Sequence, residues 1–222
     1  MRVLVIGASG RTGQLAMNEI LKRGHEVIAL VRKTSSLAEQ KDLTIVQGTP
    51  ANVEDLDHAF TLPVGKPDAV LVTLAASRTS DSPFAKPVTP RFFMRDAVHN
   101  TLATMEKHGV RKIVIMSVFG AGSSAAELPW LIKAMFTHTN MSFQTEDHNA
   151  VDADVRRHDK LDYTLVRPPM LKEGDALPVK EAGETGKGIG MFASITRNSV
   201  AQSLADALEK DTWSRKAVVL TN

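Results

Sequence analysis

The sequence has no cysteine, few aromatic residues and no long apolar run. Without cysteine the chain can form no disulfide, no thiolate metal site and no thiol nucleophile. One tyrosine and two tryptophans are too few for a surface that stacks nucleic-acid bases. No stretch approaches the roughly 18 apolar residues of a transmembrane helix. The seven histidines show no ligand-like spacing, so we expect no metal site.

An excess of one charge is also missing, because 27 basic residues face 25 acidic residues and the formal net charge is +2. This balance gives no electrostatic footprint for nucleic acid or an anionic membrane. Val3–Ile6 lead directly into a glycine turn, with no polar region for signal-peptide cleavage. We therefore expect a cytoplasmic protein with no nucleic-acid or membrane partner.

Short apolar runs alternate with helical stretches along the chain. Continuous apolar runs are typical of parallel strands that are covered on both faces. The β-α-β rhythm predicts right-handed crossovers and an α/β fold with a Rossmann-like, doubly wound parallel sheet. With 222 residues and no internal repeat, we expect a single domain over residues 1–222. The predicted strands are Val3–Ile6, Val27–Val31, Leu43–Val46, Ala69–Leu74, Ile113–Met116, Tyr163–Val166 and Ala217–Leu220.

Two loop-rich stretches interrupt this rhythm. Residues 77–90 contain three prolines and many hydroxyl groups, and residues 170–195 contain five glycines. The ligand crevice of an open α/β sheet lies beyond the carboxyl ends of its strands, where both stretches begin. Both are predicted to form walls of a substrate pocket. Five apolar side chains near these loops are candidates for a flat wall that faces an aromatic acceptor, or else belong to the ordinary core: Phe119, Trp130, Met135, Phe136 and Phe192.

Three evenly spaced glycines form the sequence GASGRTG, residues 7–13, directly after the first predicted strand. Gly7 would allow a sharp turn, Gly10 the approach of a phosphate, and Gly13 close packing of the following helix on the sheet. The free N–H groups and the dipole of that helix favour an anion. In this β-α-β context the pattern predicts a dinucleotide-binding site.

The end of the second predicted strand distinguishes NADP from NAD. An NAD site places an acid there to bind the ribose 2′-hydroxyl, whereas here Arg32 and Lys33 follow the apolar run. Arg11, from the glycine turn, is expected to project toward the same point. Two guanidinium groups suit a 2′-phosphate, so the predicted cofactor is NADP(H).

With these residues the chain resembles the atypical short-chain dehydrogenases, in particular the NAD(P)H-binding group of biliverdin-IXβ/flavin reductases and NmrA-like proteins. The matching stretches are GASGRTG with HEVIALVRK, VRKIVIMSVFGAG, EDHNAVDADVRRHDKLDYTLVRPPML and ITRNSVAQSLADAL, where Thr196 and Ser199 would cap a helix. The resemblance implies a cofactor site formed by Gly7, Ser9, Gly10, Arg11, Thr12, Gly13, Arg32, Leu74, Ala75, Ala76, Ser117, Pro168, Pro169 and Met170.

Two positions depart from that family. Thr49 follows Gly48 where an acid that contacts adenine is usual, so Thr49 is expected to line the cofactor site with a weaker contact or none. Met170 stands where the flavin-reductase-like members carry a histidine. A substrate-contacting role for that histidine therefore does not transfer to this chain.

The acid–base pair of conventional short-chain dehydrogenases is missing. The one tyrosine, Tyr163, is followed four residues later by Arg167 rather than lysine, and it lies inside a predicted strand. Hydride transfer to a flavin or quinone needs mainly orientation and a proton from water. Ser117 is a candidate to orient the nicotinamide or pass a proton, or it merely ends a strand. His148, expected with Glu146 and Asp147 at a helix start, is a candidate general acid because the pKa of a histidine lies in the useful range, although acids there also complement the helix dipole.

Two functions remain open at this point. The first is an NADPH-dependent oxidoreductase that transfers a hydride to a flavin, quinone or similar conjugated small molecule. The second is a non-catalytic regulator that senses NADP(H). Nothing in the sequence predicts a stable assembly, so we expect a monomer or a weak dimer.

Overall fold

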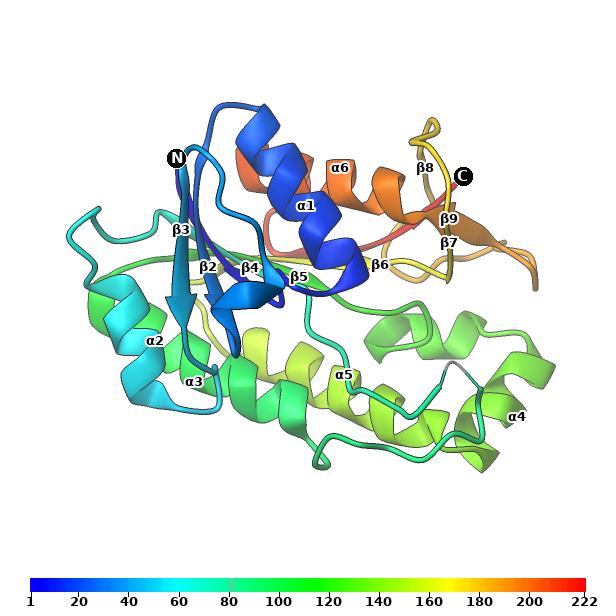
Figure 1. Cartoon of the computed structure of the whole chain (residues 1–222). Helices are drawn as coiled ribbons and strands as arrows, with labels where there is room; N and C mark the ends of the chain where they lie inside the picture. The colour runs from blue at the N-terminus through cyan, green and yellow to red at the C-terminus, as the bar shows by residue number, and fades with distance from the viewer. Residues whose placement is uncertain (81) are drawn as a thin grey trace.

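Seven parallel strands form the centre of the structure, and each coincides with one of the seven predicted runs. The structure is a computed structural model that describes residues 1–80 and 82–222. The sheet order is β3-β2-β1-β4-β5-β6-β10-β8, with only β8 antiparallel (Figure 1). The parallel strands are β1 (Arg2–Ile6), β2 (Glu26–Val31), β3 (Leu43–Gln47), β4 (Ala69–Val72), β5 (Lys112–Met116), β6 (Asp162–Arg167) and β10 (Lys216–Thr221). The predicted doubly wound Rossmann-like fold is confirmed.

Helices cover both faces of this sheet (Figure 1). Val3 and Val5 of β1 point into one apolar core, whereas Leu4 and Ile6 point into the other. This alternation explains why the run is continuously apolar. One face carries α1 (Arg11–Lys22) and α6 (Arg197–Glu209), the other carries α2 (Val53–Phe60), α3 (Phe93–His108) and α5 (Met141–Val155), and α4 (Trp130–His138) packs against α5.

The stretch 170–195 is more ordered than the sequence predicts. It contains β7 (Met170–Lys172) paired in parallel with β9 (Ser194–Thr196), and β8 (Lys180–Glu181) paired with β10. Strands of two or three residues are too short to show a periodicity. The stretch 77–90 is irregular as expected, and residue 81 within it lies outside the described residues. The predicted cap of α6 is confirmed, because the Thr196 hydroxyl accepts a hydrogen bond from the Ser199 N–H at 3.2 Å.

A buried ion-pair network joins β6 to α5. Arg167 is fully buried, and its Nη2 donates to the carboxylate of Asp152 on α5. Its Nη1 donates to Ser123 Oγ at 2.8 Å and to the Glu184 carbonyl at 2.9 Å. Arg156 donates to the second Asp152 oxygen at 2.6 Å. Arg167 is therefore a buried structural residue that links β6 to α5.

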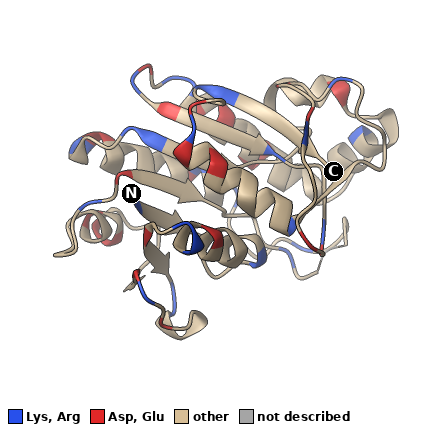
Figure 2. Ribbon diagram, turned by 90° about the horizontal axis from the view of Figure 1, so that it is seen from above, with Lys and Arg blue, Asp and Glu red and all other residues tan. Residues whose placement is uncertain are grey.

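Charged residues of both signs are intermixed over the helices and loops in the view from above (Figure 2). No helix in the described part of the chain has both the length and the apolar character that a membrane crossing needs.

Candidate functional site

A cleft of about 340 Å³, here called the glycine cleft, opens at the carboxyl ends of β1 to β4. β1 lies between β2 and β4 in the sheet, so the chain connections on its two sides diverge at this point. Such a switch point is where open α/β sheets bind ligands. The predicted cofactor residues that line the cleft are Gly7, Ser9, Gly10, Arg11, Thr12, Arg32, Thr49, Leu74 and Ala75.

The structure explains the three glycines of the turn in different ways. Gly7 has a φ of +95°, and a Cβ there would lie 2.8 Å from Thr73 Oγ1. A Cβ on Gly13 would lie 2.1 Å from the Gly7 carbonyl oxygen, whereas one on Gly10 would meet that same oxygen at 3.3 Å. The packing of the turn thus requires glycine at positions 7 and 13, whereas Gly10, which lines the cleft beside Gly7, is less restricted by packing. Sequence reasoning missed Thr73, although a hydroxyl directly after the run AVLV was a usable signal.

Alanine at Gly13 should therefore lower stability, whereas alanine at Gly10 should lower cofactor affinity. We expect Gly13→Ala to lower the free energy of unfolding by about 1–3 kcal/mol, because the new methyl group overlaps the turn backbone. Gly10→Ala should leave the free energy of unfolding nearly unchanged but weaken cofactor binding. Denaturant titration and cofactor titration of both variants check this. A Gly13→Ala protein as stable as Gly10→Ala would contradict the assignment.

Three arginines surround the glycine cleft. Arg11 and Arg32, the two arginines that the sequence analysis assigns to the cofactor, line it. Arg197, the first residue of α6, lines it too, and its Nη1 donates to Thr12 Oγ1 at 2.9 Å. Glu173 pairs with both Arg197, at 2.8 Å, and Arg11, at 3.8 Å. Sequence reasoning missed Arg197 because 185 residues separate it from Thr12 along the chain.

A second cavity of about 360 Å³, the diproline pocket, adjoins the glycine cleft at the ends of β4, β5 and β6. The two share a border, since Arg11, Leu74, Ala75, Ser77, Met116 and Arg197 line both. Five further predicted site residues line the diproline pocket and not the glycine cleft. These are Ala76, Ser117, His148, Pro168 and Pro169.

Other predicted residues lie outside both cavities. Gly13 is buried in the packing of the turn, and Met170 lies half-exposed in β7. The five apolar side chains that are candidates for a pocket wall or for the core lie away from both cavities. Phe119 packs in a small core with Leu128, and Trp130 is exposed to solvent. The five candidates that line neither cavity are Phe119, Trp130, Met135, Phe136 and Phe192.

Asp147 and His148 lie in the second turn of α5 rather than at a helix start. The Asp147 carboxylate accepts the N–H groups of Met94 at 2.9 Å and Arg95 at 2.7 Å. It therefore caps α3, whose own N-cap residue Phe92 provides no side-chain bond. Burial raises the pKa of Asp147. The acid complements the dipole of a neighbouring helix rather than that of its own.

His148 is buried in the wall of the diproline pocket. Its Nδ1 has no hydrogen-bond partner among the described residues. Burial lowers the pKa of His148 from 6.5 to about 4, so the imidazole is neutral at pH 7. The expectation of a pKa near the working range of a general acid is therefore wrong, because the sequence did not reveal the burial.

The buried imidazole should make stability depend on pH. Between pH 6.5 and 4 the unfolded chain binds a proton at His148 and the folded chain does not, so stability falls as the pH is lowered. We expect a loss of about 2 kcal/mol between pH 7 and pH 5 that His148→Gln removes. Urea titrations of both proteins at the two pH values measure it. Equal losses in the two proteins would contradict the prediction.

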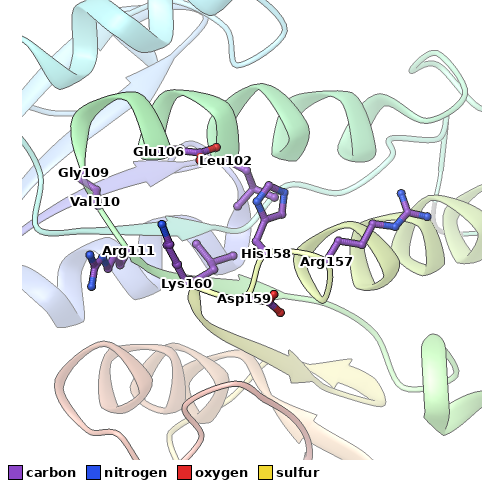
Figure 3. A pocket seen from close by; sticks show the side chains of 10 residues that line it. Leu102, Glu106, Gly109, Val110, Arg111, Arg157, His158, Asp159 and Lys160 are labelled. Carbon is purple, nitrogen blue, oxygen red and sulfur yellow. The ribbon is translucent and has the colours of Figure 1, made fainter.

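A further hollow, of about 530 Å³, lies at the opposite end of the sheet, by the amino ends of β5 and β6 (Figure 3). Arg111, Arg157, His158 and Lys160 line it, following the carboxyl ends of α3 and α5. Cations there complement the helix dipoles. No predicted site residue lies in this hollow. The described residues contain no group of three potential ligands that could hold a metal ion.

Comparison with known proteins gives a family and a fold. A family profile described as NAD(P)H-binding matches residues 7–211. The chain is 26% identical over 225 residues to the photosystem II assembly factor Ycf39 of Synechocystis, covering 97% of this chain and 61% of the relative. It is 24% identical over 225 residues to the chloroplastic divinyl chlorophyllide a 8-vinyl-reductase of Arabidopsis thaliana, covering 94% and 50%. The chain thus spans half to three fifths of the length of these relatives.

The solved structure of the anaerobillin reductase ChuY from Escherichia coli O157:H7 has the same fold. It superposes with a TM-score of 0.79 at 18% sequence identity, over 100% of this chain and 97% of that one. At 18% identity this similarity establishes that the two chains share a fold.

Proposed function

This chain belongs to the NAD(P)H-binding family, and on that premise we propose that it is an NADPH-dependent reductase that transfers a hydride to a conjugated acceptor such as a flavin or a quinone. The observation that carries the proposal is the shared border of the glycine cleft and the diproline pocket. Two adjoining cavities suit a dinucleotide and an acceptor in contact with it. The predicted nicotinamide cofactor is confirmed at the level of the family.

The residues of the glycine cleft fit this cofactor. Gly10 is the N-cap of α1 and forms no side-chain cap bond, so a pyrophosphate can take the capping position at the helix N-terminus, where the helix dipole favours an anion. Arg11 and Arg32 are proposed to bind the 2′-phosphate of NADPH. Arg197, held against Thr12, adds positive charge beside the same turn. When bound, NADPH supplies the hydride.

The diproline pocket would orient the acceptor. Ser117 follows β5, and its N–H bonds to the Val166 carbonyl at 2.7 Å, which fixes the residue at the pocket wall. Its hydroxyl is proposed to hold the nicotinamide or the acceptor. His148 is neutral at pH 7 and is proposed to hydrogen-bond the acceptor, so that water rather than an imidazolium supplies the proton.

Oxidation of NADPH by a panel of acceptors tests this function. The purified protein is mixed with NADPH and FMN, dichlorophenolindophenol or quinones, and absorbance at 340 nm is followed. We expect turnover with at least one acceptor, and a loss of kcat with Ser117→Ala while NADP⁺ affinity is kept. Absence of turnover across the panel would contradict a reductase.

One comparison favours a second candidate function, a non-catalytic NADP(H) sensor. The similar Synechocystis protein is named as an assembly factor rather than as an enzyme. A sensor would bind NADP(H) and reduce no acceptor. The names of the Arabidopsis and Escherichia coli proteins favour the reductase instead.

A further inference from the structure

Arg78 places an unsatisfied cation in the wall of the diproline pocket. Its Nη1 is buried and has no hydrogen-bond partner among the described residues. The backbone around it is fixed, because Arg78 forms a bridge with Pro87 and the Thr79 N–H donates to the Lys86 carbonyl at 3.0 Å. A buried guanidinium nitrogen without a partner is costly and rare. Its position in a pocket wall therefore indicates a ligand that satisfies it.

The charge of the pocket points to an anionic ligand. Among the described residues, its lining contains three arginines and no carboxylate. Arg11 and Arg197 also line the glycine cleft, and both pair with Glu173. Arg78, in contrast, lines the diproline pocket and not the glycine cleft. The side of the pocket away from the cofactor residues thus carries the positive charge of Arg78, and the described part of its lining holds no counter-charge.

The neighbours of Arg78 in the lining narrow the chemistry of that anion. Nδ1 of His148 is another buried nitrogen without a hydrogen-bond partner among the described residues. Gln144 lies one turn earlier on the same face of α5 and lines the pocket too. Both are uncharged polar groups at pH 7. Most of the remaining lining is apolar, including Leu74 and Val118. One cation beside uncharged groups matches a singly charged carboxylate better than a doubly charged phosphate.

Resting on the reductase function proposed above, we propose that the natural acceptor is a conjugated molecule that carries a carboxylate, and that Arg78 binds this carboxylate. The planar guanidinium can donate two parallel hydrogen bonds to the two carboxylate oxygens. Gln144 and His148 lie within the same lining and contribute further hydrogen bonds. The apolar walls receive the conjugated body. Arg78 thereby selects acidic acceptors over neutral ones of the same shape.

A binding experiment separates this proposal from turnover. The complex with NADP⁺, which cannot donate a hydride, is titrated by calorimetry with a naphthoquinone that bears a propionate side chain and with its methyl ester. We expect the wild-type protein to bind the acid about tenfold or more tightly than the ester. Arg78→Met should abolish this preference and leave the ester affinity unchanged. Lys86→Met, which removes one exposed charge from the same loop, should retain the preference.

Equal binding of acid and ester by the wild type, or equal weakening of both by Arg78→Met, would overturn the proposal. FMN and riboflavin form the second matched pair. A preference for FMN that exceeds the preference for the acid and is lost in Arg78→Met would reassign the site to a phosphate and overturn the carboxylate. NADP⁺ affinity of each variant reports folding. If no acceptor is reduced but the acid still binds through Arg78, the reductase function fails while the carboxylate site stands.

Discussion

Replacing both Arg11 and Arg32 with alanine should weaken NADPH binding about a hundredfold or more and leave NADH binding nearly unchanged. Both side chains line the glycine cleft, at the turn and at the end of β2. Hydrogen bonds to charged groups are worth about 1.5–3 kcal/mol each, and only NADPH has the 2′-phosphate that would receive them. Fluorescence titration of wild type and variant with both cofactors measures the two dissociation constants.

Lys22→Ala is the matched control for this prediction. It removes a cation from the last turn of α1, on a side chain that is 77% exposed and pairs only with Glu19 at 3.8 Å in the described part of the chain. Its effect on both cofactors should be small. An equal loss of NADPH and NADH affinity in the double variant would show that the arginines stabilise the structure of the cleft rather than bind the 2′-phosphate.

The largest loss of stability should come from Asp152→Ala. The change leaves Arg167, which is 0% exposed, without the carboxylate that balances its charge. Removing one partner of a buried ion pair costs about 3–5 kcal/mol, because the remaining charge stays desolvated. Denaturant unfolding should show this loss. Asp154→Ala, two residues along α5, breaks a pair with the exposed His99, the one ion pair of Asp154 in the described part of the chain, and should cost less than about 1 kcal/mol. Similar losses in both variants would contradict the role of the network.

Much of the fold could be predicted because a buried strand can be identified from a short run of neighbouring apolar residues. Continuous apolar runs such as Val27–Val31 identified the parallel strands, and the glycine turn identified the strand that begins the dinucleotide site. The hydroxyl at position 196 and its partner Ser199 likewise identified the start of α6. These features depend on neighbouring residues, and the confirmed fold follows from them.

The parts that were missed depend on long-range packing. Arg197 reaches the glycine turn from the far end of the chain, and Asp147 caps a different helix. The burial of His148, which lowers its pKa to about 4, depends on how α5 packs beside the pocket. Arg78 lies in a stretch without periodicity, so only the structure shows its unpartnered nitrogen.

The central claim is that the glycine cleft binds a dinucleotide that carries a 2′-phosphate. Calorimetric titration of the wild-type protein with NADPH and with NADH tests it most directly. We expect both to bind at one site per chain, with NADPH at least about tenfold tighter. Binding of neither cofactor, or NADH binding as tight as NADPH, would contradict the claim.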